Sequence, residues 1–277
     1  MTAHYRFAAP GPIVAALVLA GALAALSTIP QVRAGSQKAH RKAAAASVDP
    51  PVATKPVAMP FRTGETLNYR LSWAAFSNAA SAQLTVPEQR DLFGYPTWHL
   101  RAQGHTLSPL RSFATVDDQF DSYADQSTLE ARQYETHLDE LGKIQNQIFH
   151  FTEPEQASRA PGPSVVVTPG TRDPLGTLYE LRRVDWEHTP EFRGAVYDGH
   201  DLYEITAKRE TDEDTVAIAA GTFSASRISF DLFQHQEPVP GIHVIIWIAN
   251  DAARTPVLMQ AQLPFGNVRA ELTSASQ

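Results

Sequence analysis

The pattern that most constrains this chain is an alternation of apolar and polar side chains with a period of two residues. It is clearest in Glu65–Ala74, where the even positions 68, 70 and 72 are polar. The apolar positions of this segment are Leu67, Tyr69, Leu71 and Trp73. Because successive side chains of a strand point to opposite faces, the segment is predicted to be a β-strand with one face in the core.

Similar segments recur along the chain, separated by turn-forming residues. Turn signals such as Leu141-Gly142, Pro240-Gly241 and Asn250-Asp251 follow at short intervals, which is typical of strands joined as hairpins. We therefore predict an all-β, mostly antiparallel fold, namely a large curved sheet, an open barrel or a sandwich. The further strands are expected at residues 79–86, 97–105, 115–123, 130–137, 143–152, 164–168, 201–209, 215–219, 222–233, 243–249, 257–263 and 267–273, with the acidic residues 210–214 as a solvated hairpin tip.

One segment has helical spacing instead. Asp173 can cap a helix, and Pro174 fits its first position. Arg182 lies in the last turn, where a cation interacts favourably with the helix dipole. The apolar residues at helical spacing are Leu175, Leu178, Tyr179 and Leu181. We expect this single helix to pack against the sheet at one opening.

The first sixty residues differ from the rest in composition. Residues 1–34 contain a long apolar run rich in alanine, followed by Val32-Arg33-Ala34, which fits a signal-peptidase site. We expect a cleaved signal peptide and an exported, periplasmic bacterial protein; the alternative is that the run stays as a membrane anchor. Residues 35–60, rich in proline and alanine, are expected to be a disordered linker. Residues 61–277 are expected to form one antiparallel domain.

Composition excludes several classes of protein. The chain has 277 residues and 43% hydrophobic residues, too many for a wholly disordered protein. It contains no cysteine, which excludes disulfides and cysteine metal sites. The formal net charge of −7 is not the basic footprint of a nucleic-acid-binding protein. We therefore expect no nucleic-acid partner.

Motifs that carry chemistry are absent from the sequence. It has no nucleophile elbow of the G-x-S-x-G type, no glycine loop for phosphate and no H-E-x-x-H. His99 and His105 share a face of one predicted strand, but six residues of strand span about 20 Å, too far for a common metal ion. We predict no catalytic set, no metal site and no cofactor.

Asp118 requires a partner if the sheet buries it. It shares a strand face with Val116 and Phe120, and an unpaired buried carboxylate costs several kcal/mol. Arg182, at the end of the helix, is the natural candidate. We predict a structural Asp118–Arg182 ion pair that fixes the helix on the sheet; the alternative is an anion or ligand site.

Large aromatic residues are candidates for the lining of an apolar cavity. Aromatic side chains also make up ordinary cores, so this hypothesis competes with simple packing. The candidate ligand-binding residues are Trp73, Trp98, Phe120 and Trp247.

Five strings of residues resemble the exported bacterial family called domain of unknown function 3108. The first, Gly64-Glu65-x-Leu-x-Tyr-x-Leu-Ser-Trp73, is similar to the opening of that family. The others, in the same order, are found at residues 118–125, 173–182, 247–257 and 265–273. One departure is Asn78-Ala-Ala-Ser81, where family members usually have glycine after the first strand. The resemblance implies an exported, mostly antiparallel β protein and no known activity.

Two functions follow from these observations, with a third as their alternative. The first is a non-enzymatic, β-barrel-like envelope protein that binds an apolar or lipid-like ligand in its curved sheet. The second is a hydrolase of envelope polymer or lipid, with Asp118, Asp251 or a histidine as acid–base group. The third is a structural scaffold that contacts an envelope protein partner. The absence of a catalytic constellation favours the first over the second.

Overall fold

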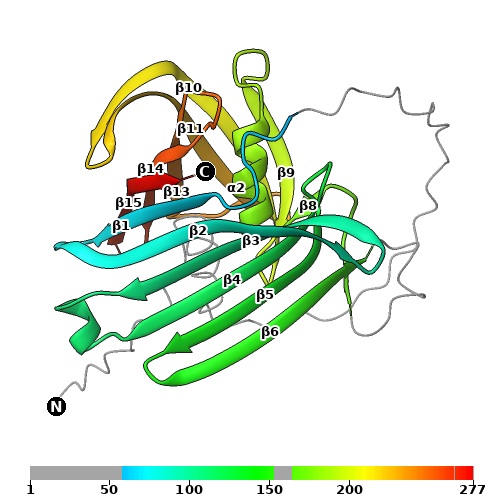
Figure 1. Cartoon of the computed structure of the whole chain (residues 1–277), viewed down its shortest axis with the longest axis horizontal. Coiled ribbons are helices and arrows are strands. Elements are labelled where there is room, and N and C mark those ends of the chain that lie inside the picture. The colour runs from blue at the N-terminus through cyan, green and yellow to red at the C-terminus, as the bar shows by residue number, and fades with distance from the viewer. Residues whose placement is uncertain (1–57, 153–163, 265, 277) are drawn as a thin grey trace.

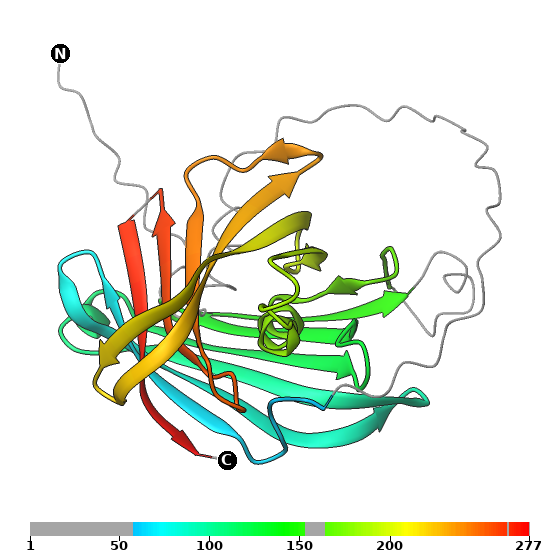
Figure 2. The same ribbon diagram turned by 90° about the horizontal axis from the view of Figure 1, so that it is seen from above.

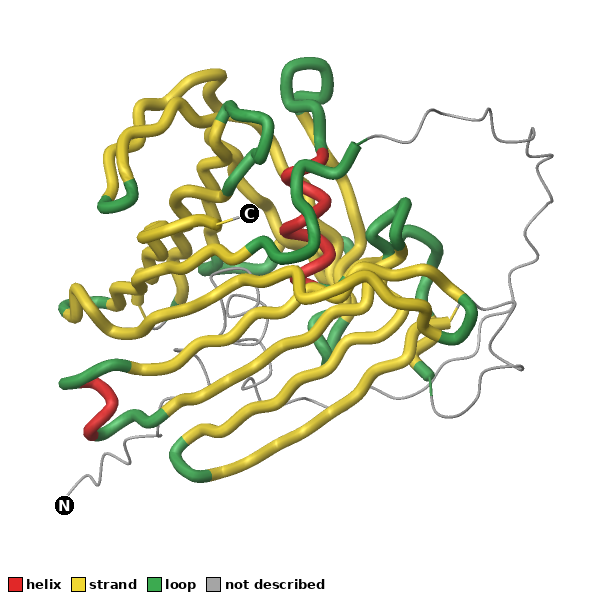
Figure 3. Tube along the Cα trace, viewed as in Figure 1, coloured by secondary structure: helices red, strands yellow, loops and turns green. Residues whose placement is uncertain are grey.

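The computed structural model describes residues 58–152, 164–264 and 266–276. The predicted signal peptide and the linker up to residue 57 lie outside the described residues. The described chain is mostly strand with short connections (Figure 3), and it forms a large curved sheet with a single α-helix against it (Figures 1 and 2). The predicted all-β, mostly antiparallel fold with one packed helix is therefore confirmed.

The chain builds the sheet in two consecutive halves. The first half contains β1 (Thr66–Trp73), β2 (Phe76–Leu92), β3 (Tyr95–Thr106), the short 3-10 helix η2 (Leu110–Ser112), β4 (Val116–Asp125), β5 (Ala131–Glu140), β6 (Lys143–Thr152) and β7 (Val165–Val166). The second half contains β8 (Thr171–Arg172), α2 (Pro174–Arg183), β9 (Glu191–Tyr197), β10 (Leu202–Ile218), β11 (Gly221–Gln234), β12 (Glu237–Pro238), β13 (His243–Ala249), β14 (Pro256–Leu263) and β15 (Gly266–Ser276).

Strand order follows from these two halves. The order is β7-β6-β5-β4-β3-β2-β1-β15-β14-β13-β11-β10-β9-β8, with β12 paired to β11. The first and last strands, β1 and β15, pair at the centre and join the halves. All of these pairings are antiparallel except β6–β7 and β8–β9, which are parallel. The short strands β7 and β8 therefore form the two ends of the sheet.

Two local features differ from the sequence prediction. Residues 210–214 are not a hairpin tip: they lie inside β10, which runs unbroken to Ile218. Two irregularities in the pairing of β10 with β11, between Arg209 and Thr211 and between Thr211 and Asp214, accommodate the acidic stretch within the strand. The first turn falls at Ala74, which has a positive φ of 49°, so Asn78–Ser81 lies within β2 and not in a turn.

The helix α2 lies within the curve of the sheet, where Figure 2 shows it end-on. Its cap and N-terminal proline are as predicted: Asp173 Oδ1 accepts a hydrogen bond from the Gly176 amide at 2.8 Å, and Pro174 begins the helix. Phe61, before β1, joins the helix to the sheet, because its ring lies 4.7 Å from that of Tyr179 and 5.0 Å from that of Trp98.

Aromatic side chains connect the two ends of the open sheet. Phe149 and Phe151 of β6 each approach Tyr197 of β9 edge-on, with ring centroids 5.7 Å apart. Backbone pairing does not close the barrel at this place, since β7 and β8 each pair with only one neighbour. Between these two ends of the sheet, aromatic side chains are in contact although no backbone hydrogen bonds join the strands.

Candidate functional site

The fully buried Arg182 is fixed by a carboxylate from the first half of the sheet. Its guanidinium nitrogens donate to Glu65 Oε1 and Oε2 at 2.6 and 2.7 Å, and both side chains are 0% exposed. The same guanidinium donates to the carbonyls of Ala253 and Arg254 at 2.9 and 3.2 Å. This bidentate geometry satisfies a buried cation and ties α2 to β1 and to the β13–β14 turn.

The predicted Asp118–Arg182 ion pair is therefore wrong. Asp118 is buried, as expected, but it accepts a hydrogen bond from the Asp139 amide at 3.1 Å. Arg182 instead meets Glu65, which shares its strand parity with Leu67 and Tyr69. That parity places Glu65 on the core face and could have added it, beside Asp118, to the candidate partners of Arg182.

Asp118 has another carboxyl group as its neighbour. Burial and the nearby Glu140 carboxylate raise the pKa of Asp118 to about 7. Burial also raises the pKa of Glu140 to about 6, although its hydrogen bond with Asp118 opposes the shift. Like charges close together cannot both ionise cheaply, so the two groups hold a proton between them near neutral pH.

The four candidate aromatic residues do not share one site. Cross-strand pairing places Trp73, Trp98 and Phe120 on the concave face of the sheet, with Trp98 and Phe120 buried in the core. Trp247 points to the opposite face, where its indole nitrogen donates to Asp214 Oδ2 at 2.9 Å. A cavity lined by all four residues is therefore excluded, and ligand binding by any of them stays a prediction.

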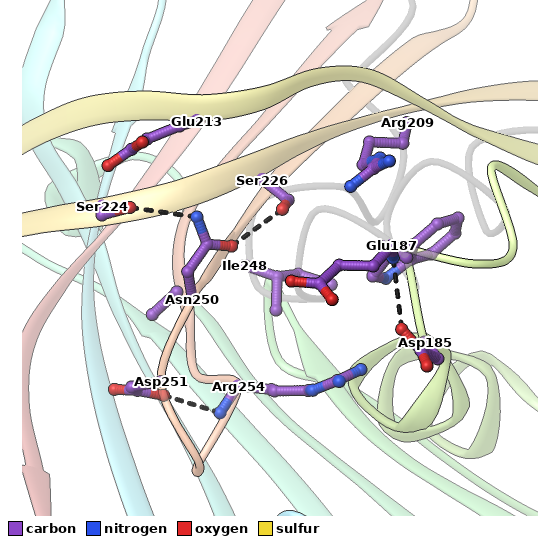
Figure 4. Close-up of a pocket in the computed structure, with 12 residues that line it drawn as sticks. Asp185, Glu187, Arg209, Glu213, Ser224, Ser226, Ile248, Asn250, Asp251 and Arg254 are labelled. Atoms are coloured by element: carbon purple, nitrogen blue, oxygen red, sulfur yellow. Dashed lines mark hydrogen bonds between the residues drawn. The ribbon is translucent and has the colours of Figure 1, made fainter.

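A pocket of about 700 Å³ lies beside the end of α2, on the concave side of β10, β11 and β13 (Figure 4). Trp186 and Ile248 contribute apolar surface to it. Three segments far apart in the sequence build the pocket: the stretch after α2, the β10–β11 hairpin and the β13–β14 turn. The lining residues are Asp185, Trp186, Glu187, Arg209, Glu213, Ser224, Ser226, Ile248, Ala249, Asn250, Asp251 and Arg254.

Hydrogen bonds hold the polar wall of this pocket in place. Asn250 bridges two residues of β11, donating to Ser224 Oγ at 3.0 Å and accepting from Ser226 Oγ at 2.8 Å. Asp251 Oδ1 accepts from the Arg254 amide at 2.7 Å, which gives Asp251 the turn role expected of Asn-Asp in a hairpin. The Arg254 guanidinium donates to the carbonyl of Val184 and so links the turn to the end of α2.

Charges of both signs face this pocket. Arg209 and Arg254 are its cations, and Glu187 and Glu213 are exposed acids at its rim. A hydrogen bond from His188 lowers the pKa of Asp185, so this carboxyl is ionised at neutral pH. The arrangement can orient a polar ligand by hydrogen bonds and charge, with Trp186 and Ile248 as its apolar surface.

Two groups of side chains elsewhere in the described residues have metal-ligand chemistry. Asp121, Glu135 and His137 lie on the outer face of the first half of the sheet, with ligand atoms within 4.8 Å of one another. Asp121 already accepts a hydrogen bond from Arg101 at 2.7 Å, so one of its carboxylate oxygens is engaged by a cation of the protein. The second group, Asp185, Glu187 and His188, is exposed. The absence of a metal site stays a prediction.

Comparison with known proteins identifies the family. The family described as "Protein of unknown function (DUF3108)" matches residues 68–273. The chain belongs to this family. No curated protein matches the sequence.

Solved structures resemble this DUF3108 protein in fold. A beta-barrel-like protein of the family DUF1849 from Brucella abortus has a TM-score of 0.50 at 10% identity, covering 76% of this chain and 96% of its own. A protein from Bacteroides fragilis described as exported, with a YmcC-like fold, has a TM-score of 0.37 at 11% identity over 79% and 98%. One from Parabacteroides distasonis described as a lipoprotein has 0.35 at 13% identity over 78% and 96%. The first likeness agrees with the curved, barrel-like sheet.

Three of the five strings by which this chain resembles DUF3108 proteins meet in space. Glu65 comes from the first string, Arg182 from the helix string, and Ala253 and Arg254 from the string at 247–257. All of them meet at the Arg182 guanidinium, beside the pocket. The sequence singled out these segments through the family resemblance. It did not predict the pocket, because the segments that line it come together only in the folded, curved sheet.

Proposed function

We propose that this DUF3108 protein is a non-enzymatic binding protein of the bacterial envelope. Its ligand is an amphipathic, lipid-like molecule whose polar head group occupies the pocket beside α2. The apolar part of the ligand contacts Trp186 and Ile248 at the pocket wall. This proposal keeps the lipid-like ligand expected from the sequence and moves its head group away from the four candidate aromatic residues.

The observation that carries the proposal is the pocket's size and lining. A volume of about 700 Å³ falls in the range of sites for small molecules, about 300–1,000 Å³. Fixed polar groups orient a ligand in such sites. The lining here is mostly polar and charged, and its apolar residues are Trp186, Ile248 and Ala249. Here Asn250 and Arg254 are fixed by hydrogen bonds to neighbouring segments, so the polar wall exists before a ligand arrives.

The charges narrow the chemistry of the head group. Arg209 and Arg254 suit an anionic group, while Glu187 and Glu213 suit a cationic one. A zwitterionic head group offers complementary charge to both signs, whereas a purely apolar ligand would remove water from these charges and offer no complementary charge.

Export is the second part of the proposal and depends on the N-terminal sequence. The apolar run and the Val32-Arg33-Ala34 site are typical of a secretory signal peptide. Within the described ranges, the structure contains no helix with the length and apolarity of a membrane span. A periplasmic location places the protein where lipid-like ligands of the envelope occur.

The enzymatic alternative has weaker support. Asp251, one candidate acid–base group, uses a carboxylate oxygen to accept the Arg254 amide. Asp118, the other, lines a different part of the sheet and shares its proton with Glu140. General acid–base chemistry requires such groups around one reacting atom, and the pocket does not bring these two together.

Native mass spectrometry of protein purified from the periplasm tests this proposal. Ser224→Trp would fill the pocket from β11, while Thr222→Trp adds the same ring at an exposed position of that strand outside the lining. We expect a bound lipid-like mass on the unmodified protein and on Thr222→Trp, and its loss from Ser224→Trp. Absence of any adduct on the unmodified protein, or equal retention by both variants, would contradict the proposal.

A further inference from the structure

Strand β6 presents a long unpaired edge. It pairs with β5 from Lys143 to His150, but β7 covers its other side only at Phe151 and Thr152. Within the described part of the chain, Lys143–His150 therefore has no strand on that side, and Figure 1 shows this edge at the border of the sheet. Ile144 and Ile148 are 71% and 56% exposed, although isoleucine is normally a core residue.

The direction of the free backbone groups follows from the β5–β6 hairpin. Glu140 and Lys143 pair across the two-residue turn Leu141-Gly142, whose positive φ angles of 52° and 76° match the turn that favours a hydrogen-bonded closing pair. Hydrogen-bonded positions alternate along an antiparallel pair, so the odd-numbered residues of β6 bond to β5. The even-numbered residues point outward, in agreement with the Thr152 carbonyl, which accepts from Val167.

The sequence of this edge is a palindrome. Residues 144–148 read Ile-Gln-Asn-Gln-Ile, the same in both directions. If two copies pair antiparallel about a twofold axis at Asn146, Ile144 lies opposite Ile148 of the other copy and Gln145 lies opposite Gln147. Both isoleucine pairs then fall on one face and the glutamine pairs on the other, because side chains alternate along a strand.

We propose that two copies of this chain associate through antiparallel pairing of β6 with β6, which joins two curved sheets into one. The pairs 144–148, 146–146 and 148–144 each exchange both backbone hydrogen bonds, because their N–H and C=O groups already point outward. The apolar pairs cover Ile144 and Ile148. The symmetry is isologous, as in most homodimers.

Charge does not oppose a second copy at this edge. The whole chain has a formal net charge of −7, which opposes close approach of two copies in general. The segment 144–148 carries no charge at all, and the residue before it is Lys143. Edge strands that avoid pairing usually carry charged residues, proline or a bulge, and this segment of β6 has none of these.

Disulfide trapping tests the register directly. Because the chain has no cysteine, Asn146→Cys introduces one thiol that meets its own counterpart at the twofold axis. The matched control is Gln147→Cys, whose position lies opposite Gln145. Under mild oxidation we expect a covalent dimer of Asn146→Cys at concentrations where Gln147→Cys stays monomeric on non-reducing gels. Equal cross-linking of the two variants would overturn the proposed register.

Charge substitution at the exposed isoleucines tests the dimer without a covalent bond. Ile144→Lys with Ile148→Lys places like charges opposite each other, whereas Ile144→Lys with Ile148→Glu places Lys opposite Glu in both pairs. In sedimentation velocity over a range of concentrations, we expect dimers of the unmodified and Lys/Glu proteins and a monomer of the Lys/Lys protein. A monomer of the unmodified chain at all concentrations, or identical behaviour of the two double variants, would refute the proposal.

Discussion

The concave side of the sheet holds two pairs of ionisable groups: one pair is fully buried, and the other joins a buried residue to a half-buried one. Glu65 and Arg182 carry opposite charges, are fully buried and share two short hydrogen bonds. Asp118 and Glu140 are both acids, and burial raises the pKa of each. The first pair holds α2 in place through its two hydrogen bonds. In the second pair, the raised pKa values favour the protonated, neutral form of the carboxyl groups.

The difference shows what a buried charge requires in this fold. Arg182 has acceptors on every side: the two oxygens of Glu65 and the carbonyls of Ala253 and Arg254. Asp118 has one backbone donor, the Asp139 amide, and the charged groups that act on it are the acids Glu140, Asp117 and Asp139. The cost of removing the Arg182 charge from water is therefore offset by its acceptors. For Asp118, the same cost is avoided by protonation, which makes the carboxyl group neutral.

Breaking the Glu65–Arg182 pair is expected to have the largest effect. Removing one partner of a buried pair leaves an orphan charge and typically costs about 3–5 kcal/mol. We expect Arg182→Ala and Glu65→Ala each to lower the free energy of unfolding by this amount, and the double variant to lose less than the sum, as measured by urea denaturation. Arg183→Ala is the control, because this neighbour pairs with Glu180 at the partly exposed side of α2. Single variants within about 1 kcal/mol of the unmodified protein would contradict the structural role.

The effect of Asp118→Asn on the free energy of unfolding is expected to depend on pH, which distinguishes the acid pair from the Glu65–Arg182 pair. The pKa of Asp118 is about 7 in the fold and about 3.9 in an unfolded chain, so between these values the folded state binds more protons. Stability contributed by this group therefore falls as pH rises from about 4 to about 7. Asparagine cannot ionise, so we expect Asp118→Asn to match the unmodified protein near pH 4 and to exceed it by about 4 kcal/mol near pH 8, at about 1.4 kcal/mol per pKa unit.

The control for this experiment is Asp117→Asn on the neighbouring residue. Asp117 points to the outer face, where a hydrogen bond from Arg111 lowers its pKa. Its substitution is expected to lower stability slightly at neutral pH, the opposite sign. Burial also raises the pKa of Asp173 to about 6, so the total slope contains other groups, and the decisive quantity is the difference between variant and unmodified protein. A difference that does not change from pH 4 to pH 8 would mean that Asp118 titrates normally.

The sequence predicted the strands far better than the contacts between them. Alternation located β1 because each residue's face depends on its immediate neighbours, and the cap at Asp173 located α2 for the same reason. The partner of Arg182 is 117 residues away, so it depends on how the whole sheet curves. Parity placed both Glu65 and Asp118 on the core face, and only the fold decides which of them the helix end reaches.

The pocket was unpredictable for a related reason. Its polar residues, such as Ser224, Asn250 and Glu187, are individually ordinary turn or surface residues. They become a wall because the β10–β11 hairpin and the β13–β14 turn approach the end of α2. The acidic residues 210–214 were predicted to be a hairpin tip, because the sequence does not show whether such a stretch turns or continues as a strand. In the structure, β10 continues through it with two irregularities in its pairing.

An exposed ion pair provides the smallest effect and completes the comparison. Arg70 on β1 donates to Glu271 on β15 at 2.9 Å, but their side chains are 44% and 21% exposed. Hydrogen bonds from Arg70 and Arg269 outweigh the effect of burial and lower the pKa of Glu271, and Arg269 remains after Arg70 is removed. Because water screens both partners, we expect Arg70→Ala to cost about 0–1 kcal/mol, and less in high salt, by urea denaturation at two salt concentrations. A loss comparable to that of Arg182→Ala would mean that the cross-strand pair joining the two halves of the sheet, and not burial, decides what an ion pair contributes here.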